Sequence, residues 1–129
     1  MATLTAKISL ISASGGAFTS ALNAEISHTY TVDLQNANGK IKIVATDTSQ
    51  LIPGCVAATT GSTLVVIKNI DDPSLQLHNG SYAVDQVVAN LGIGEVFCTT
   101  IAGSQNLQAY GTINKYFEVY TFELATDRS

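Results

Sequence analysis

This sequence contains no tryptophan and a single arginine, Arg128. Proteins that clamp phosphates or read guanine edges usually do so with arginine guanidinium groups. The lysines are scattered along the chain rather than clustered among aromatic residues, and the formal net charge is -4. We therefore expect that the protein does not bind nucleic acid.

Long apolar runs are missing as well. No segment approaches the roughly 18 consecutive apolar residues of a membrane-spanning helix. The N-terminal stretch "MATLTAKISLISASGG" lacks the charged start and the continuous apolar core of a signal peptide. We expect a protein that is made and folded in a cytoplasm and that does not associate with a membrane.

Cysteine is scarce, and Cys55 and Cys98 form no CxxC pair, so the sequence offers no support for a zinc site. Each cysteine lies in an apolar segment. We interpret them as two buried thiols in a reducing compartment, with a disulfide between them as the alternative.

Charged residues make up only 12% of the chain, whereas 46% of the residues are apolar. Much of the surface must therefore consist of Thr, Ser, Asn and Gln side chains, and such a surface suits packing against neighbouring molecules. The length of 129 residues is enough for one core and too short for two stable ones. We predict one domain over residues 1–129.

Strict alternation of apolar and polar residues is the main structural signal. The segment "HTYTVDLQN", residues 28–36, places an apolar side chain at every second position. The following Asn38-Gly39 pair favours a tight hairpin turn, because both central positions of such a turn need a positive φ. We predict a hairpin here, with Lys40–Thr46 as its second strand.

Two later segments are apolar on both faces. "STLVVIKNI" (Ser62–Ile70) predicts a central strand covered on both sides, and "KYFEVYTFEL" (Lys115–Leu124) predicts a central strand or a subunit contact. With "TAKISLIS" near the start and the short segments between these two, we count about eight strands. This spacing predicts an all-β, single-domain antiparallel β-sandwich.

Residues 11–27 are the least patterned part of the chain. We expect this segment to become ordered only through contacts with a partner. Residues 1–24 are accordingly predicted to form an extended N-terminal arm that the sandwich does not need in order to fold.

The stretch "VVIKNIDDPSLQLHNG" raises a choice between a metal site and a turn. Asp71, Asp72 and His78 carry oxygen and nitrogen ligands, but this set is small for calcium, which takes about six to eight oxygens. Asp side chains also bond the backbone two residues further on, and Pro73 fixes φ and ends the strand. We predict a turn, with no metal ion and no cofactor.

Catalysis finds little support in the residues. No GxSxG nucleophile elbow occurs, and we interpret His28 and His78 as surface or turn residues. Glu118 and Glu123 lie on opposite faces of one strand, because their spacing is odd. We predict no catalytic residue, and we expect Glu95 to bond backbone amides or a lysine at the mouth of a loop.

Five short motifs lie between residues 62 and 125: "VVIKNIDD", "SLQLHNG", "LGIGEVF", "NLQAYGT" and "KYFEVYTFEL". Taken together, they resemble the pattern of small virion structural proteins of tailed bacteriophages, particularly those that infect cyanobacteria. The resemblance implies a jelly-roll-like sandwich that decorates or cements the capsid, or that belongs to the tail or fibre apparatus. The Asp-Asp-Pro turn then needs no ion, and we expect Asn69 to be buried and to bond the adjacent loop.

The resemblance also implies partners and a location. The partners would be the major capsid protein or other virion proteins, and the protein would reside in the virion after assembly in the host cytoplasm. The chain would form a homo-oligomer, with a trimer favoured at local three-fold positions. The candidate interface residues are Tyr116, Phe117, Tyr120, Phe122 and Phe18.

Two other classes of function stay open. A carbohydrate-binding or tail/fibre adhesion module would use Tyr82, Tyr110 and polar loop residues, although the absence of tryptophan speaks against a dedicated lectin. An enzyme or metal-dependent hydrolase would require His78 or Asp72.

Overall fold

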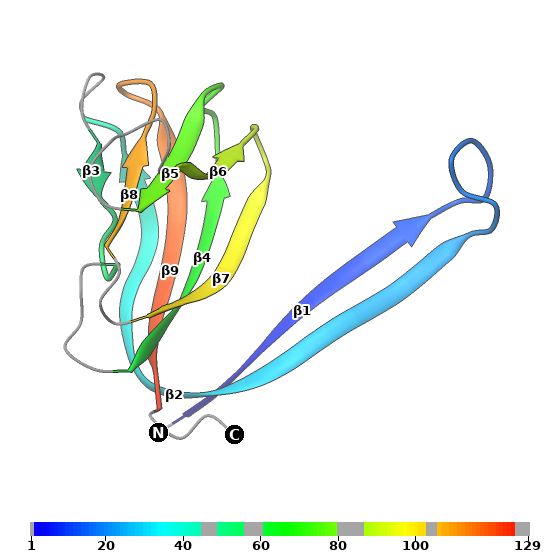
Figure 1. Cartoon of the computed structure of the whole chain (residues 1–129), viewed down its shortest axis with the longest axis horizontal. Helices are drawn as coiled ribbons and strands as arrows, with labels where there is room; N and C mark the ends of the chain where they lie inside the picture. The colour runs from blue at the N-terminus through cyan, green and yellow to red at the C-terminus, as the bar shows by residue number, and fades with distance from the viewer. Residues whose placement is uncertain (1, 45–48, 56–60, 80–86, 103–105, 126–129) are drawn as a thin grey trace.

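The computed structural model of the chain describes residues 2–44, 49–55, 61–79, 87–102 and 106–125. These residues form nine β-strands and no helix (Figure 1). The strands are β1 (Ala2–Ser12), β2 (Leu22–Lys42), β3 (Gln50–Leu51), β4 (Ser62–Asn69), β5 (Leu75–Asn79), β6 (Val87–Leu91), β7 (Val96–Ala102), β8 (Leu107–Tyr110) and β9 (Tyr116–Leu124). The predicted all-β fold with about eight strands is confirmed.

The strands form two antiparallel sheets, with the orders β1-β2-β9-β4-β7 and β3-β8-β5-β6. From β2 onward the pairs are nested, because β2 pairs with β9, β3 with β8, β4 with β7 and β5 with β6. This is the pairing of one long hairpin that is rolled up so that successive pairs fall in alternate sheets. The result is an eight-stranded sandwich with jelly-roll connectivity, and β1, which was included in the predicted count of about eight strands, is an addition to it.

The hydrophobic core lies between the two sheets. Alternate residues of each strand point inward, so β4 contributes Val65 and Ile67, and β9 contributes Phe117 and Val119. All four side chains are fully buried. The core is completed by Ala37, Ile43, Ile52, Cys55, Leu75, Leu77, Leu91, Ile101, Leu107 and Ala109.

Both β4 and β9 are central strands, as predicted, since β9 lies between β2 and β4, and β4 lies between β9 and β7. Their alternate side chains reach the face of the five-stranded sheet that is turned away from the core, which we call the outer sheet face. There Leu64 is fully buried in a second, smaller apolar cluster with Val32 and Leu124. Strand β4 is therefore covered on both sides at Leu64 and Val65, whereas Lys68 near its end is exposed.

A long hairpin projects from the sandwich (Figure 1). Strand β1 pairs with the first half of β2 from Ala2 opposite Val32 to Ser12 opposite Leu22. We call residues 2–31 the arm, and at its tip Gly15 and Phe18 exchange two backbone hydrogen bonds. Residues 11–27, which were expected to be ordered only by a partner, thus belong to paired strands and to the tip within one chain.

The predicted hairpin at Asn38-Gly39 is wrong. Strand β2 continues through both residues and pairs them with β9. Gly39 has a φ of 139°, in the region that favours glycine, and the register of β2 against β9 shifts twice between residues 32 and 37. β-Bulges bend strands, so the two register shifts curve β2 where it passes from the arm into the sandwich, and Gly39 lies beyond them in the part of β2 that pairs with β9.

Candidate functional site

The Asp-Asp-Pro segment forms a turn between β4 and β5, as predicted. Asp72 is fully buried, and its Oδ1 atom accepts a hydrogen bond of 2.9 Å from the backbone N–H of Ser74, two residues further on. Its Oδ2 atom accepts a second bond of 2.9 Å from the backbone N–H of Thr112. The carboxylate therefore joins this turn to the connection between β8 and β9, where a side chain at Gly111 would overlap it.

Asn69 holds the same turn from the end of β4. Its Oδ1 atom accepts a 2.9 Å bond from the backbone N–H of Asp72, and its Nδ2 atom donates to the carbonyls of Asp72 at 2.7 Å and Leu91 at 2.8 Å. The predictions that Asn69 is buried and that it bonds the adjacent loop are confirmed. Glu95 also acts as predicted, because its Oε1 atom accepts a 2.7 Å bond from the backbone N–H of Gly92.

The two histidines differ in environment. His78 lies in β5 and is fully buried, so the prediction that it is a surface or turn residue is wrong. Its Nε2 atom shares a 3.2 Å hydrogen bond with Oε1 of Gln76, and its ring meets the edge of Tyr110. His28 is exposed on the arm, as expected, and its ring centroid lies 4.6 Å from that of Tyr30. In the described part of the chain, no three His, Cys, Asp or Glu side chains gather as a metal site would require.

The two cysteines are free thiols, so the disulfide alternative is wrong. The prediction that both are buried holds for Cys55, which lies in the core, and fails for Cys98, which is exposed on the outer sheet face. Burial raises the pKa of the Cys55 thiol to about 12. Such a thiol stays protonated and unreactive at neutral pH.

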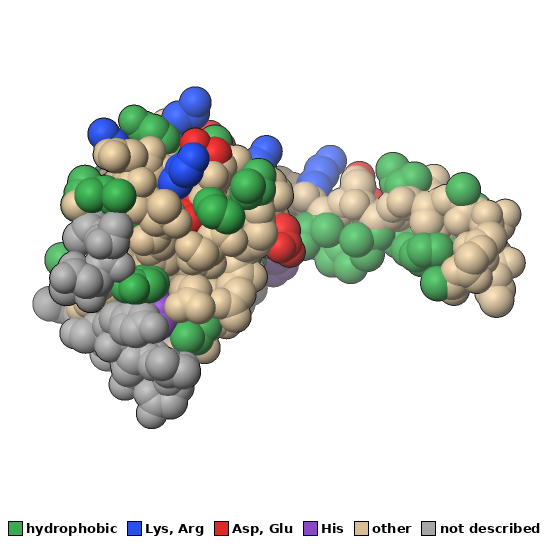
Figure 2. Space-filling view, turned by 90° about the horizontal axis from the view of Figure 1, so that it is seen from above, with side chains coloured by type: hydrophobic (Ala, Val, Ile, Leu, Met, Phe, Trp, Pro, Cys, Tyr) green, Lys and Arg blue, Asp and Glu red, His purple; other side chains and the backbone are tan. Residues whose placement is uncertain are grey.

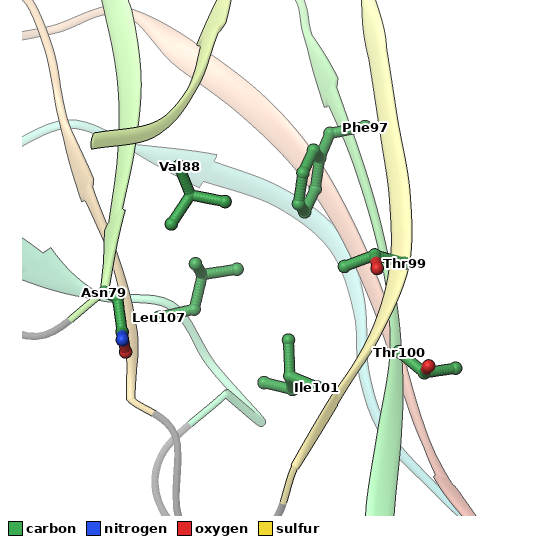
Figure 3. A pocket seen from close by; sticks show the side chains of 7 residues that line it. All are labelled: Asn79, Val88, Phe97, Thr99, Thr100, Ile101 and Leu107. Atoms are coloured by element: carbon green, nitrogen blue, oxygen red, sulfur yellow. The ribbon is translucent and has the colours of Figure 1, made fainter. Parts of the chain in front are cut away.

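A cavity of about 210 Å³ opens between the sheets at the side where β6 faces β7 (Figure 3). Val88 and Leu107 point into it from the four-stranded sheet, and Phe97 and Ile101 point into it from β7. Asn79 lies at its border. None of the described residues that line this cavity carries an ionisable group, and we assign it no chemistry.

The two faces of the arm differ in character. Even-numbered residues of β1 lie opposite even-numbered residues of β2, so they share one face. We call this the apolar arm face, and it carries one histidine, His28, among the apolar residues Leu4, Ala6, Ile8, Leu10, Leu22, Ala24, Ile26 and Tyr30. The opposite face carries mainly threonine, serine and the charged residues Lys7 and Glu25. The sequence signal for this face is the alternation of apolar and polar residues in "TLTAKISL". The sequence pattern predicted a strand in this region but did not predict an exposed apolar face.

Much of the apolar arm face is exposed to solvent. Ile8 and Ile26, which pair across the two strands, are 54% and 60% exposed. Only at the base of the arm are Leu4 and Tyr30 partly buried, where they pack against the outer sheet face. Figure 2 shows hydrophobic side chains along the arm from its base toward its tip. A long exposed apolar surface of this kind marks an interaction site in most soluble proteins.

A groove of about 740 Å³ lies where the arm meets the outer sheet face, in the angle between arm and sandwich that is visible in Figure 1. The base of the arm lines one side of this arm groove with Leu4–Ile8 and with Ile26, Ser27, His28 and Tyr30. The sheet side is lined by Leu64, Val66, Val96, Cys98, Tyr120 and Phe122. The apolar arm face and the apolar part of the outer sheet face are therefore continuous.

Charged residues border the arm groove at one end. Glu118 of β9 lies opposite both Lys40 of β2 and Lys68 of β4. The hydroxyl of Tyr120 donates a hydrogen bond to Oε2 of Glu118, and this bond raises the pKa of Tyr120. The outer sheet face thus changes from charged to apolar as it approaches the arm.

The predicted interface residues fall in different places. Tyr120 and Phe122 line the arm groove, and Phe18 is exposed at the arm tip. Tyr116 is partly exposed at the far end of β9, whereas Phe117 points into the core and is fully buried. The structure therefore brings Tyr120 and Phe122 together with arm residues that sequence reasoning did not single out.

Two candidates for sugar binding can be placed in part. Tyr110 is half-buried in β8 beside His78. Tyr82 lies outside the described residues.

A scan against protein-family models and searches of curated proteins and of solved structures found no match for this chain. Within the described residues there is also no helix with the length and apolar character needed to cross a membrane.

Proposed function

We propose that this chain is a non-enzymatic structural protein of a tailed-phage virion, which decorates or cements the capsid through protein–protein contacts. The observation that carries the proposal is the exposed apolar face of the arm. The resemblance of residues 62–125 to phage virion proteins supplies the kind of assembly. The major capsid protein is the proposed partner, and a trimer is the favoured oligomer.

The physical argument concerns the stability of the arm. A two-stranded ribbon is at best marginally stable in water unless a third strand or another element packs on it. Strand β1 is the edge of its sheet, and the outer part of the arm pairs only within itself. Covering the apolar arm face would contribute roughly 25 cal/mol for each Å² of apolar surface removed from water. This gain supports a role in an assembly.

The buried polar residues support the non-enzymatic part of the proposal. Asp72 uses its two carboxylate oxygens to bond backbone amides, and His78 lies in the interior beside Tyr110. Both residues that an enzyme hypothesis would need are thus engaged within the fold, away from the surface.

The carbohydrate-binding hypothesis has weaker support. Jelly rolls occur in both viral capsid and lectin domains, so the fold is compatible with either function and the site has to decide. Tyr110, the candidate stacking residue that the structure describes, is half-buried rather than presented on an open face. A glycan array with specific binding above background would favour this hypothesis over the virion one.

The proposal is tested by co-expressing the full chain with the major capsid protein of the phage that encodes it, followed by gradient sedimentation of the shells. We expect the chain to sediment with the shells at a fixed ratio. A chain that stays at the top of the gradient while shells form would contradict the virion role.

A further inference from the structure

We infer that the arm groove is the docking site for the arm of a second copy of this chain, so that each copy inserts one arm and receives one. The inference rests on the assembly role proposed above and names the occupant of the site. It follows from the chemistry of the two surfaces, from their area and from the edge of the arm.

The chemistry of the arm matches that of the arm groove. The part of the arm beyond its base presents aliphatic side chains such as Leu10 and Leu22 on its apolar face. The sheet side of the groove presents Val66, Val96 and Phe122. The arm side of the groove also includes Lys7 and His28. Residues 9–24, the part of the arm beyond its base, contain no Lys, Arg, Asp, Glu or His. An incoming arm therefore brings no charge into the groove.

The area favours a second copy over an unrelated partner. With 11 residues in β1, the arm is about 35 Å long, and a two-stranded ribbon is about 10 Å wide. One arm face in one groove would thus bury on the order of 350 Å² on each side, which is less than half of the ~800 Å² per partner in a stable interface. Reciprocal exchange also covers the sheet side of each copy's own groove, so the buried surface of each copy rises above that of a single insertion and moves toward this value.

The edge of the arm favours docking by its face rather than by strand pairing. Strand β1 has a free edge along the five-stranded sheet, and such edges invite pairing with another chain. Lys7 lies in the middle of this edge strand, and lysines at such positions discourage edge-to-edge pairing. The apolar face is left as the adhesive surface of the arm.

Paired substitutions separate the arm from the arm groove. Leu10→Lys with Ala24→Glu places opposite charges across one strand pair on the apolar arm face, which preserves the ribbon and leaves the residues that line the arm groove unchanged. Val96→Glu charges the groove and gains Lys68 as its cross-strand neighbour. Ser9→Lys is the matched control, because it adds a charge opposite Glu25 on the other face of the arm.

The readouts are the mass of the assembly by light scattering and the reactivity of Cys98 toward a maleimide. Cys98 lines the arm groove, whereas Cys55 is buried in the core and serves as the internal control. We expect the wild-type chain and Ser9→Lys to form a two-fold pair or a closed ring in which Cys98 is protected. The arm variant and the groove variant should each associate at least tenfold more weakly, with Cys98 reacting at the rate of the dilute monomer.

Mixing the arm variant with the groove variant tests the pairing of the two surfaces. The mixture leaves one intact arm and one intact groove, so we expect mixed pairs to form where each variant alone is monomeric. A wild-type chain that stays monomeric over a 100-fold concentration series reaching about 100 μM would overturn the inference, since this range covers ordinary binding strengths. So would an arm variant that folds and keeps the wild-type mass, or an assembly in which Cys98 stays reactive.

These outcomes are separable from those of the capsid test. A chain that exchanges arms but never sediments with shells would leave this inference standing and remove the virion role. A monomeric chain that does sediment with shells would do the reverse. If Leu10→Lys with Ala24→Glu fails to fold, Val96→Glu gives the answer alone, since it lies on the sandwich and not on the arm.

Discussion

The sandwich and the arm of this molecule are built from the same kind of alternating sequence, yet they treat their apolar faces in opposite ways. In the sandwich, residues such as Val65 and Phe117 are fully buried between two sheets. In the arm, Ile8 and Ile26 have the same orientation relative to their strands but remain more than half exposed. A second layer covers the first set, and nothing within the described chain covers the second.

This difference indicates that the residues of the sandwich determine folding, whereas those of the arm determine association. The nested pairing of β2 to β9 closes on itself and needs no other molecule. The arm has a single layer and gains a second one by binding. Substitutions in the two regions should therefore have different consequences: loss of stability in the sandwich and loss of association in the arm.

The largest expected effect comes from two phenylalanines, one in each region. Phe117→Ala removes a fully buried ring from the core and should lower the free energy of unfolding by about 3–5 kcal/mol. Phe18→Ala at the exposed arm tip should change it by less than about 0.5 kcal/mol. Urea denaturation measures both. Equal losses in the two variants would contradict the division between sandwich and arm.

The two cysteines give a comparison that depends on pH. Burial raises the pKa of Cys55 to about 12, whereas the ordinary pKa of a cysteine thiol is 9.0. Because the folded pKa is the higher one, stability is fully present below pH 9 and is lost as the pH rises toward 12, by at most about 4 kcal/mol. Cys55→Ala should flatten this part of the stability profile, and Cys98→Ala should flatten it less. Parallel profiles for wild type and Cys55→Ala would contradict the burial of this thiol.

Two asparagines test the interpretation of the Asp-Asp-Pro segment as a turn rather than a metal site. Asn69→Ala breaks three buried hydrogen bonds and should destabilise the sandwich by about 3 kcal/mol. Asn90→Ala changes an exposed residue and should have little effect on the melting temperature. A chelator should leave the wild-type melting temperature unchanged. A lower melting temperature with the chelator would show that the turn needs an ion after all.

Removal of the arm should have the smallest effect on folding. Deletion of residues 1–24 exposes part of the outer apolar cluster, where Leu4 packs against the sandwich, and should cost about 1–2 kcal/mol. The remaining sandwich should still unfold in one cooperative transition. A truncated chain without cooperative melting would mean that the arm is part of the folding unit.

Much of the sandwich could be predicted from the sequence, because its apolar pattern is consistent over whole strands. β4 and β9 are apolar on both parities and are central, and the Asp-Asp-Pro turn follows from local hydrogen bonding. The Asn38-Gly39 pair led to a wrong prediction of a hairpin, since a glycine with a positive φ occurs within a strand here and not only in turns. Tertiary pairing with β9 decided between the two.

The candidate site was less accessible to sequence reasoning. The alternation in β1 indicates a strand but does not say whether its apolar face meets the core or the solvent. That depends on where β2 leaves the sandwich, which is set by pairings between residues some 90 positions apart, such as Val32 with Leu124. The burial of His78 was missed for a similar reason, because its short strand is covered by segments distant in sequence.

The most direct test of the account is the absolute mass of the full chain and of residues 25–129, measured by light scattering over the same micromolar concentration series. We predict a closed oligomer, with a trimer favoured, for the full chain and a monomer at every concentration for the truncated one. Equal masses for the two chains would contradict the claim that the arm is the element through which this protein assembles.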